Sequence, residues 1–100
     1  MARDPRFDIL FEPIRIGPVT ARNRFYQVPH CNGMGHLRPA ALAAMRGVKA
    51  EGGWAAVCTE EVEISPHSEI APHFEGRLWD ERDLPALRAM TDACHAHGAL

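Results

Sequence analysis

A histidine and a cysteine stand side by side after an apolar segment, and this pair is the clearest sign of chemistry in the chain. The tripeptide Pro29-His30-Cys31 follows the segment Phe25–Val28. A neighbouring imidazolium lowers the pKa of a thiol, and the thiolate that results is a strong nucleophile. Cys31 is therefore a candidate for forming a covalent bond. The alternative is an inert thiol, because most free cysteines behave as small hydrophobic side chains.

A second group of candidates follows another apolar segment. Three glutamates stand in Thr59–Glu63, directly after Trp54–Cys58. A carboxylate can accept a hydrogen bond from an N–H group or pair with an ammonium ion. Glutamates in a loop are more often a solvated surface. A substrate role for Glu61 therefore depends on whether the fold brings this loop to the end of a strand.

The first 28 residues predict an antiparallel hairpin that leads into a buried strand. Leu10–Ile16 and Val19–Tyr26 are joined by Gly17-Pro18, a pair that favours a tight turn. The strand that follows the hairpin is expected to end near Val28. It delivers the Pro-His-Cys tripeptide to its own carboxyl end.

Helices and strands alternate along the rest of the chain. The predicted elements are a helix over 39–51, a strand over 54–58, a long polar loop over 59–77, a helix from 80 to 97 and the start of a strand at 99–100. Pro39 suits the first turn of a helix, and Asp80 with Asp83 suits a capped N-terminus. Glycines follow both helices, as is common at helix ends. The inner face of the first helix is expected to carry Ala41, Leu42, Met45 and Val48.

This alternation predicts an α/β fold with parallel strands and crossover helices. Two βα units by themselves fit either a doubly wound sheet or a barrel. In a (β/α)8 barrel the active site lies at the carboxyl ends of the strands, the edge that would hold both Cys31 and Glu61. Since 99–100 begins a further strand, we expect these 100 residues to be the N-terminal part of a longer protein.

Three segments of the sequence resemble one enzyme family. Leu10–Ile14, Asn23–Cys31 and Val48–Trp54 are similar to the trimethylamine, dimethylamine and histamine dehydrogenases. These are FMN- and 4Fe-4S-dependent amine dehydrogenases of the old yellow enzyme superfamily. The resemblance implies that residues 1–100 are an N-terminal fragment of a flavin-binding TIM-barrel domain. They would supply the hairpin that closes the bottom of the barrel and the first two βα units, so that the barrel is incomplete in this chain.

The same resemblance implies where the cofactor and the substrate bind. In the family, the cysteine matching Cys31 is joined covalently to C6 of FMN, and the backbone of Val28, Pro29 and His30 lies along the flavin ring. The trimethylamine branch has a tyrosine where this chain has Glu61. That difference implies a substrate-binding role for Glu61 towards a secondary or a larger amine. No catalytic residue is expected within the segment, and the 4Fe-4S ligands lie outside it.

For the full-length protein, the resemblance implies oxidation of a secondary or tertiary alkylamine or of a biogenic amine. Electrons would pass from FMN to the 4Fe-4S cluster and then to an electron-transfer protein, and the enzyme would be a homodimer. The 100-residue chain alone is expected to be unstable and inactive. Two alternatives stay open. One is a fragment of a noncovalent FMN ene-reductase of the NAD(P)H:flavin oxidoreductase type, and the other is a non-catalytic, stand-alone α/β module.

Composition and charge limit the cellular location that we expect for the protein and the classes of molecule that it could bind. The net charge of -2 disfavours nucleic acid and anionic lipid, since both reward a basic surface. No apolar run approaches the roughly 20 residues of a membrane helix, and the N-terminus lacks the apolar core of a secretory signal. Cys31, Cys58 and Cys94 are widely spaced, which is typical of reduced thiols. Together, these features predict a cytoplasmic protein. The histidine and cysteine spacings match no zinc motif, so we expect no metal site.

Overall fold

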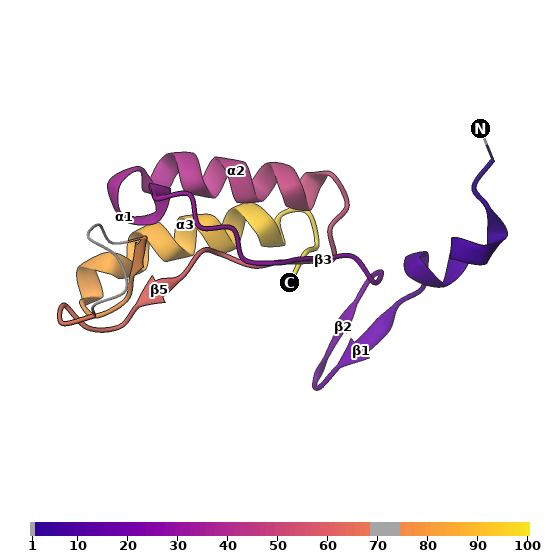
Figure 1. Cartoon of the computed structure of the whole chain (residues 1–100), viewed down its shortest axis with the longest axis horizontal. Helices are drawn as coiled ribbons and strands as arrows, with labels where there is room; N and C mark the ends of the chain where they lie inside the picture. The colour runs from indigo at the N-terminus through magenta and orange to yellow at the C-terminus, as the bar shows by residue number, and fades with distance from the viewer. Residues whose placement is uncertain (1, 69–74) are drawn as a thin grey trace.

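The computed structural model describes residues 2–68 and 75–100, and its elements follow the predicted β–α alternation. Two α-helices lie side by side over the strand segments, and the N-terminal part of the chain extends away from them (Figure 1). The elements are η1 (Pro5–Phe11), β1 (Ile14–Ile16), β2 (Val19–Ala21), β3 (Tyr26–Gln27), α1 (Met34–Leu37), α2 (Pro39–Glu51), β4 (Ala56–Val57), β5 (Val62–Glu63), β6 (Gly76–Arg77), η2 (Glu81–Asp83) and α3 (Leu84–His95).

The predicted hairpin is present, with shorter strands than expected. Strands β1 and β2 pair antiparallel, with Ile14 opposite Ala21 and Ile16 opposite Val19. The prediction that the first strand begins at Leu10 is wrong, because Leu10 belongs to the 3-10 helix η1. That helix starts with a proline, and the carboxylate of Asp4 accepts the backbone N–H of Arg6 at its N-terminus. Local capping therefore outweighs the apolar pattern.

Strands β3 and β4 form the parallel pair that the sequence predicts. Tyr26 lies opposite Ala56, and Gln27 lies opposite Val57. On the other edge of β4, the Leu100 N–H donates to the Ala55 carbonyl at 2.8 Å, and the Val57 N–H donates to the Leu100 carbonyl at 2.9 Å. Leu100 is thus hydrogen-bonded to β4 as the start of a neighbouring strand would be, in agreement with the expectation for 99–100, although no strand is assigned there.

The first predicted helix has the expected ends, whereas the second differs from the prediction. Helix α2 spans the predicted 39–51, but the helix predicted from 80 to 97 is the 3-10 helix η2 followed by α3, which ends at His95. Asp80 and Asp83 form the reciprocal capping box of η2. The buried face of α2 is rotated from the predicted one. Val48 is 65% exposed, whereas Arg46 is 0% exposed. The helices approach closely, since a Cβ on Gly47 would lie 3.2 Å from the Ala93 methyl. The core clusters are Leu42, Ala43 and Met90, and Ala50, Cys94 and Ala99.

The predicted loop over 59–77 contains two short strands, so that prediction is wrong at both of its ends. Strands β5 and β6 pair in parallel, with Val62 opposite Gly76 and Glu63 opposite Arg77. Each strand has only two residues, which is too short to show a hydrophobic period in the sequence. The part of the predicted loop over 69–74 lies outside the described residues.

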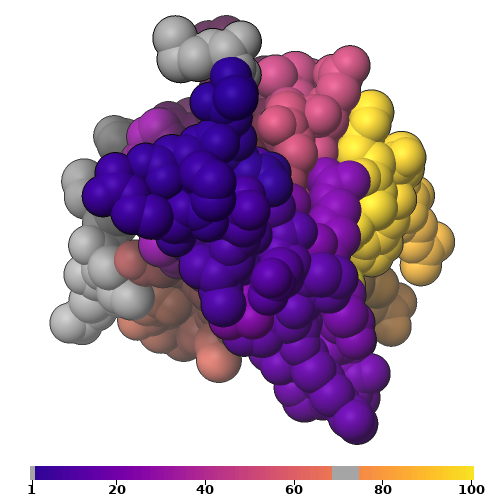
Figure 2. All heavy atoms as spheres, turned by 90° about the vertical axis from the view of Figure 1, so that its right-hand side faces the viewer, coloured from indigo at the N-terminus to yellow at the C-terminus, as the bar shows by residue number. Residues whose placement is uncertain are grey.

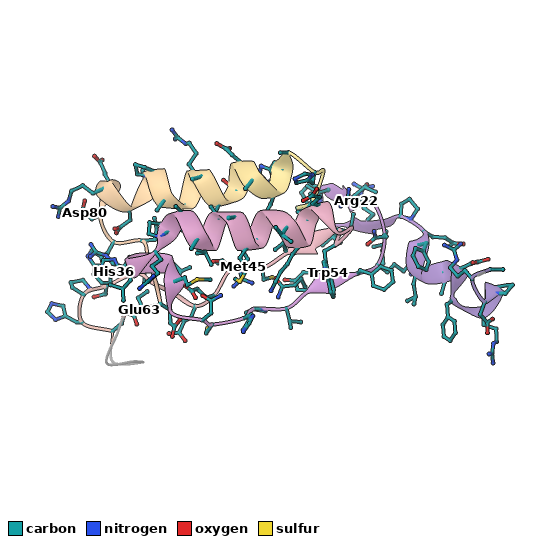
Figure 3. All side chains as sticks on the ribbon, turned by 90° about the horizontal axis from the view of Figure 1, so that it is seen from above. Arg22, His36, Met45, Trp54, Glu63 and Asp80 are labelled. Atoms are coloured by element: carbon teal, nitrogen blue, oxygen red, sulfur yellow. The ribbon has the colours of Figure 1, made fainter. Side chains whose placement is uncertain are left out.

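Hydrogen bonds fasten the hairpin to one end of the βα units. The Arg22 guanidinium donates to the carbonyls of Ala50 at 2.9 Å and Trp54 at 3.2 Å, and also to that of His97. Trp54 lies at the same end of the helix pair, whereas Asp80 lies at the opposite end (Figure 3). Viewed from that hairpin end, the N-terminal segment and the hairpin project towards the reader (Figure 2). The carboxyl ends of β3 and β4 therefore face away from the hairpin.

Candidate functional site

Cys31 and Glu61, which the sequence places on different units, meet beyond the carboxyl ends of β3 and β4. The Glu61 backbone N–H donates to the Cys31 sulfur at 3.3 Å. Parallel pairing of β3 with β4 brings the residues after both strands to one edge. The arrangement therefore places the Cys31 thiol beside the segment that carries Glu60, Glu61 and Glu63.

The four predicted cofactor-binding residues are all open to solvent on the side that the helices leave free. They are Val28, Pro29, His30 and Cys31. Successive side chains of a strand alternate between its faces. Gln27 is accordingly buried on the helix side, while Tyr26 and Val28 are 53% and 64% exposed on the other. This exposed face is apolar and could lie against a flat ring.

Helix α2 supports the same segment from behind through Arg46. The guanidinium donates to the Gln27 side-chain oxygen at 3.0 Å and to the His30 carbonyl at 2.6 Å. The Gln27 amide nitrogen in turn donates to the Val28 carbonyl. Sequence reasoning missed Arg46 because a charged residue is rarely fully buried, although its position on the inner helical face, four residues after Leu42, was a usable signal.

Carboxylates accept hydrogen bonds from the backbone N–H groups of the glycine-containing loop over 32–35. Glu60, which is 3% exposed, accepts the N–H groups of Asn32, at 3.1 Å, and Gly35. Glu75 accepts the N–H of Gly33 at 2.8 Å. A Cβ at Gly35 would lie 2.7 Å from the Glu75 carbonyl oxygen, so only glycine fits there. Because its amides already bind carboxylates, this loop is not an open cradle for a phosphate.

Other side-chain oxygens after β4 are buried without a hydrogen-bond partner in the described part of the chain. They are Thr59 Oγ1, Glu61 Oε1 and both carboxylate oxygens of Glu63. Glu63 is only 2% exposed and lies at the end of the helix pair away from Trp54 (Figure 3). Buried carboxylate oxygens are costly unless a cation or an N–H group meets them. These acceptors therefore have capacity for such a group. The sequence marked only Glu61, because nothing in the pattern separated Glu63 from a solvated glutamate.

The two remaining cysteines have separate surroundings. The Cys58 thiol donates to the Tyr26 hydroxyl at 2.6 Å, and this hydrogen bond raises the pKa of Tyr26 above its usual value. Cys94 is buried between the helices, and burial raises the pKa of its thiol. Within residues 2–68 and 75–100, no three histidine, cysteine or acidic side chains are grouped as metal ligands. The helices in this part of the chain are all too short or too polar to cross a membrane.

An apolar cavity in the described structure does not coincide with the predicted site. One cavity of about 390 Å³ is lined by Phe11, Asn23, Phe25, Gly52, Gly53 and Trp54. It lies at the hairpin end, where Phe25 stacks edge-to-face on Phe11 and on Trp54. This cavity contains none of the residues singled out for chemistry.

A family comparison matches residues 9–100 to the NADH:flavin oxidoreductase / NADH oxidase family. The chain belongs to this family. It is 56% identical over 100 residues to dimethylamine dehydrogenase of Hyphomicrobium sp. (strain x), covering all of this chain and 14% of that protein. The predicted resemblance to the dimethylamine and histamine dehydrogenases is therefore confirmed.

Two solved structures are similar over nearly the whole chain. Histamine dehydrogenase from Rhizobium sp. 4-9 is 60% identical, with a TM-score of 0.90, over 95% of this chain and 14% of that one. The 6-hydroxypseudooxynicotine amine oxidase of Pseudomonas geniculata N1 is 46% identical, with the same TM-score, over 99% and 15% respectively. The structural neighbours are TIM-barrel flavoenzymes, so the predicted barrel segment is confirmed. The chain spans about one-seventh of the length of these relatives.

Proposed function

We propose that residues 1–100 are the N-terminal segment of the flavin-binding TIM-barrel domain of an FMN-dependent amine dehydrogenase. The full-length enzyme oxidises a secondary or tertiary alkylamine or a biogenic amine. The observation that carries this proposal is the contact between Cys31 and the Glu61 amide, in a chain 60% identical to a histamine dehydrogenase. It joins a candidate flavin ligand and a candidate amine ligand at one edge of the sheet.

Val28, Pro29, His30 and Cys31 would hold the cofactor. Their exposure on the helix-free side, beside the exposed ring of Tyr26, fits a flat aromatic ligand. FMN supplies the redox chemistry, and the protein supplies position and electrostatics. Covalent linkage would exchange the Sγ–H and C6–H bonds for one Sγ–C6 bond. Two protons and one electron pair would pass to an acceptor such as dioxygen, which would become hydrogen peroxide.

Glu61 would bind the substrate amine. Its Oε1 is buried and without a hydrogen-bond partner in the described residues, so it can accept an N–H from an ammonium group. A tertiary amine without an N–H in its neutral form gains less from this carboxylate than a secondary amine or a larger, protonated amine. Because the Glu61 carboxylate accepts an N–H group, it favours secondary and biogenic amines as substrates.

The remaining machinery is proposed to lie outside this segment. It comprises the catalytic acid–base residues and the 4Fe-4S cluster that would pass electrons to an electron-transfer protein. The homodimer and the cytoplasmic location also stay predictions. They follow from the resemblance and from the composition.

The deciding experiment is the denatured intact mass of the full-length gene product, purified from its native source. We expect a chain much heavier than 11.1 kDa that carries one FMN adduct mapping to Cys31. Cys31→Ala should remove the adduct, and Cys94→Ala should keep it. Flavin that is released completely by acid would favour the noncovalent ene-reductase, and a bare 11.1 kDa chain would favour the non-catalytic module.

A further inference from the structure

A buried cation lies directly behind the segment proposed to bind the flavin. Arg46 is 0% exposed, and no acidic side chain forms a salt bridge with it in the described residues. Its hydrogen bonds go instead to the Gln27 side chain and the His30 carbonyl. Removing a guanidinium from water is costly. An apolar side chain could fill the same volume without that cost, so packing alone does not explain the arginine.

The hydrogen bond to His30 acts on Cys31 through the peptide that joins them. The atoms from the His30 Cα to the Cys31 Cα lie in one rigid plane. Fixing the His30 oxygen, 2.6 Å from Arg46 Nη2, therefore fixes the plane from which the Cys31 side chain departs. The sulfur at the other end of that side chain meets the Glu61 amide at 3.3 Å. The cysteine is held from two sides, by α2 and by the end of β4.

Gln27 links Arg46 to a second backbone carbonyl of the segment, that of Val28. Its oxygen accepts from Arg46 at 3.0 Å, and its nitrogen donates to the Val28 carbonyl. One guanidinium thereby orients two of the four residues proposed to line the flavin, directly at His30 and through Gln27 at Val28. A planar fork with several donors can make both contacts at once, whereas the single ammonium of lysine cannot do so with the same geometry.

We propose that Arg46 is a positioning residue for covalent flavin attachment, which holds the His30–Cys31 peptide so that the thiol is presented to C6 of FMN. This inference rests on the proposed linkage at Cys31. Arg46 is not proposed to contact the cofactor. It acts on the orientation of the nucleophile, to which the rate of an intramolecular attack is very sensitive.

Arg22 provides a matched control within the same chain. Its guanidinium also donates to backbone carbonyls, those of Ala50, Trp54 and His97, but at the hairpin end of the strands. Losing Arg22 should reduce stability without disturbing the Cys31 peptide. A comparison of the two arginines separates orientation from general loss of hydrogen bonds.

The experiment uses the full-length protein with Arg46→Met, Arg46→Lys and Arg22→Met. Among molecules that retain flavin, the rate of Cys31 adduct formation is followed by the mass of acid-denatured protein, and the Tm is measured in parallel. We expect Arg46→Met to slow the linkage by about tenfold to a hundredfold, which misorientation of a reacting group can cause. Arg46→Lys should be intermediate, and Arg22→Met should lower the Tm and link at the wild-type rate.

The outcomes separate this inference from the proposed function. Wild-type linkage rates in both Arg46 variants would overturn it. A linkage rate in Arg22→Met that falls in proportion to its Tm would also overturn it, because slowing would then reflect general loss of stability. If Arg46→Met does not fold, Arg46→Lys decides by the same criterion. A wild-type protein without any Cys31 adduct would instead refute the proposed linkage itself.

Discussion

Consecutive glutamates after β4 have different tasks. Glu60 turns towards the loop over 32–35 and accepts two backbone amides, which makes it a structural residue. Glu61 gives its own amide to Cys31 and keeps a carboxylate oxygen without a partner in the described chain. The residue with spare hydrogen-bonding capacity is therefore the one placed beside the nucleophile.

Glu61→Gln in the full-length enzyme should raise the KM for its preferred secondary or biogenic amine by about tenfold. A hydrogen bond to a charged group is worth about 1.5–3 kcal/mol, and the amide of glutamine retains only part of it. Steady-state kinetics at fixed pH measure the effect. Glu81→Gln, an exposed site on η2, serves as the control. An unchanged KM for every amine tested would contradict the substrate role of Glu61.

Cys94 should make stability fall at alkaline pH. Burial raises the pKa of its thiol above 9.0, and the charge of Arg46 opposes this only in part. The folded state therefore holds the proton more tightly than the unfolded state. Its contribution is complete below the unfolded pKa and is lost as the pH rises through the folded pKa. Urea unfolding over this range should show a smaller alkaline loss in Cys94→Ala, and Thr91→Ala on the same helix should behave as wild type.

The βα units depend on short capping signals as much as on their apolar faces. The carboxylate of Asp80 accepts the Arg82 N–H at 2.8 Å, and Asp83 accepts the Asp80 N–H at 3.2 Å. Together they satisfy amides that a helix N-terminus leaves without partners. The start of η2, which leads directly into α3, therefore depends on two side chains.

Asp80→Ala should lower the Tm of the full-length protein by about 1–4 °C, the range expected when an N-cap is lost from a barrel of about 250 residues. Arg82 holds the pKa of Asp80 well below its usual value of 3.8. The stabilisation from Asp80 is thus present above that value and is lost as the pH falls through the folded pKa. Thermal melts of Asp80→Ala and wild type should converge in acid. A constant difference at all pH values would contradict this assignment.

The same elements explain what the sequence could and could not predict. Helix α2 and the capping box of η2 depend on local residues, so their positions follow from the sequence. The meeting of Cys31 with Glu61 follows from the rule for parallel strands. Glu63 could not be assigned, because its burial depends on tertiary neighbours, whereas the helical spacing of Arg46 from Leu42 was a usable signal. Strands β5 and β6 are pairings between distant residues, which a local pattern does not contain.

As a whole, the 100 residues are less compact than a typical domain of this length. The radius of gyration is 15.5 Å, against about 13 Å expected for 100 residues. Large apolar side chains of the N-terminal segment and the hairpin are exposed, among them Phe7, Ile9, Phe11 and Ile16. These surfaces would be covered in a complete barrel.

The 100-residue chain in isolation should therefore melt without a cooperative transition and should oxidise no amine. Its exposed apolar surface leaves too little buried area to offset the entropy of folding. Circular dichroism with heating, together with flavin-dependent amine oxidation, measures both parts. The full-length gene product is the control. A sharp, reversible melt of the short chain would contradict the first part of this prediction.

The edge-to-face stack of Phe25 on Trp54 also gives the protein an internal optical probe. Trp54 is 37% exposed and sits where the hairpin joins the βα units, while Trp79, the second tryptophan of this chain, lies under the Arg77 guanidinium. Separation of the hairpin would expose the Trp54 indole to water and shift its emission to longer wavelength. Fluorescence could thus distinguish detachment of the hairpin from melting of the helices.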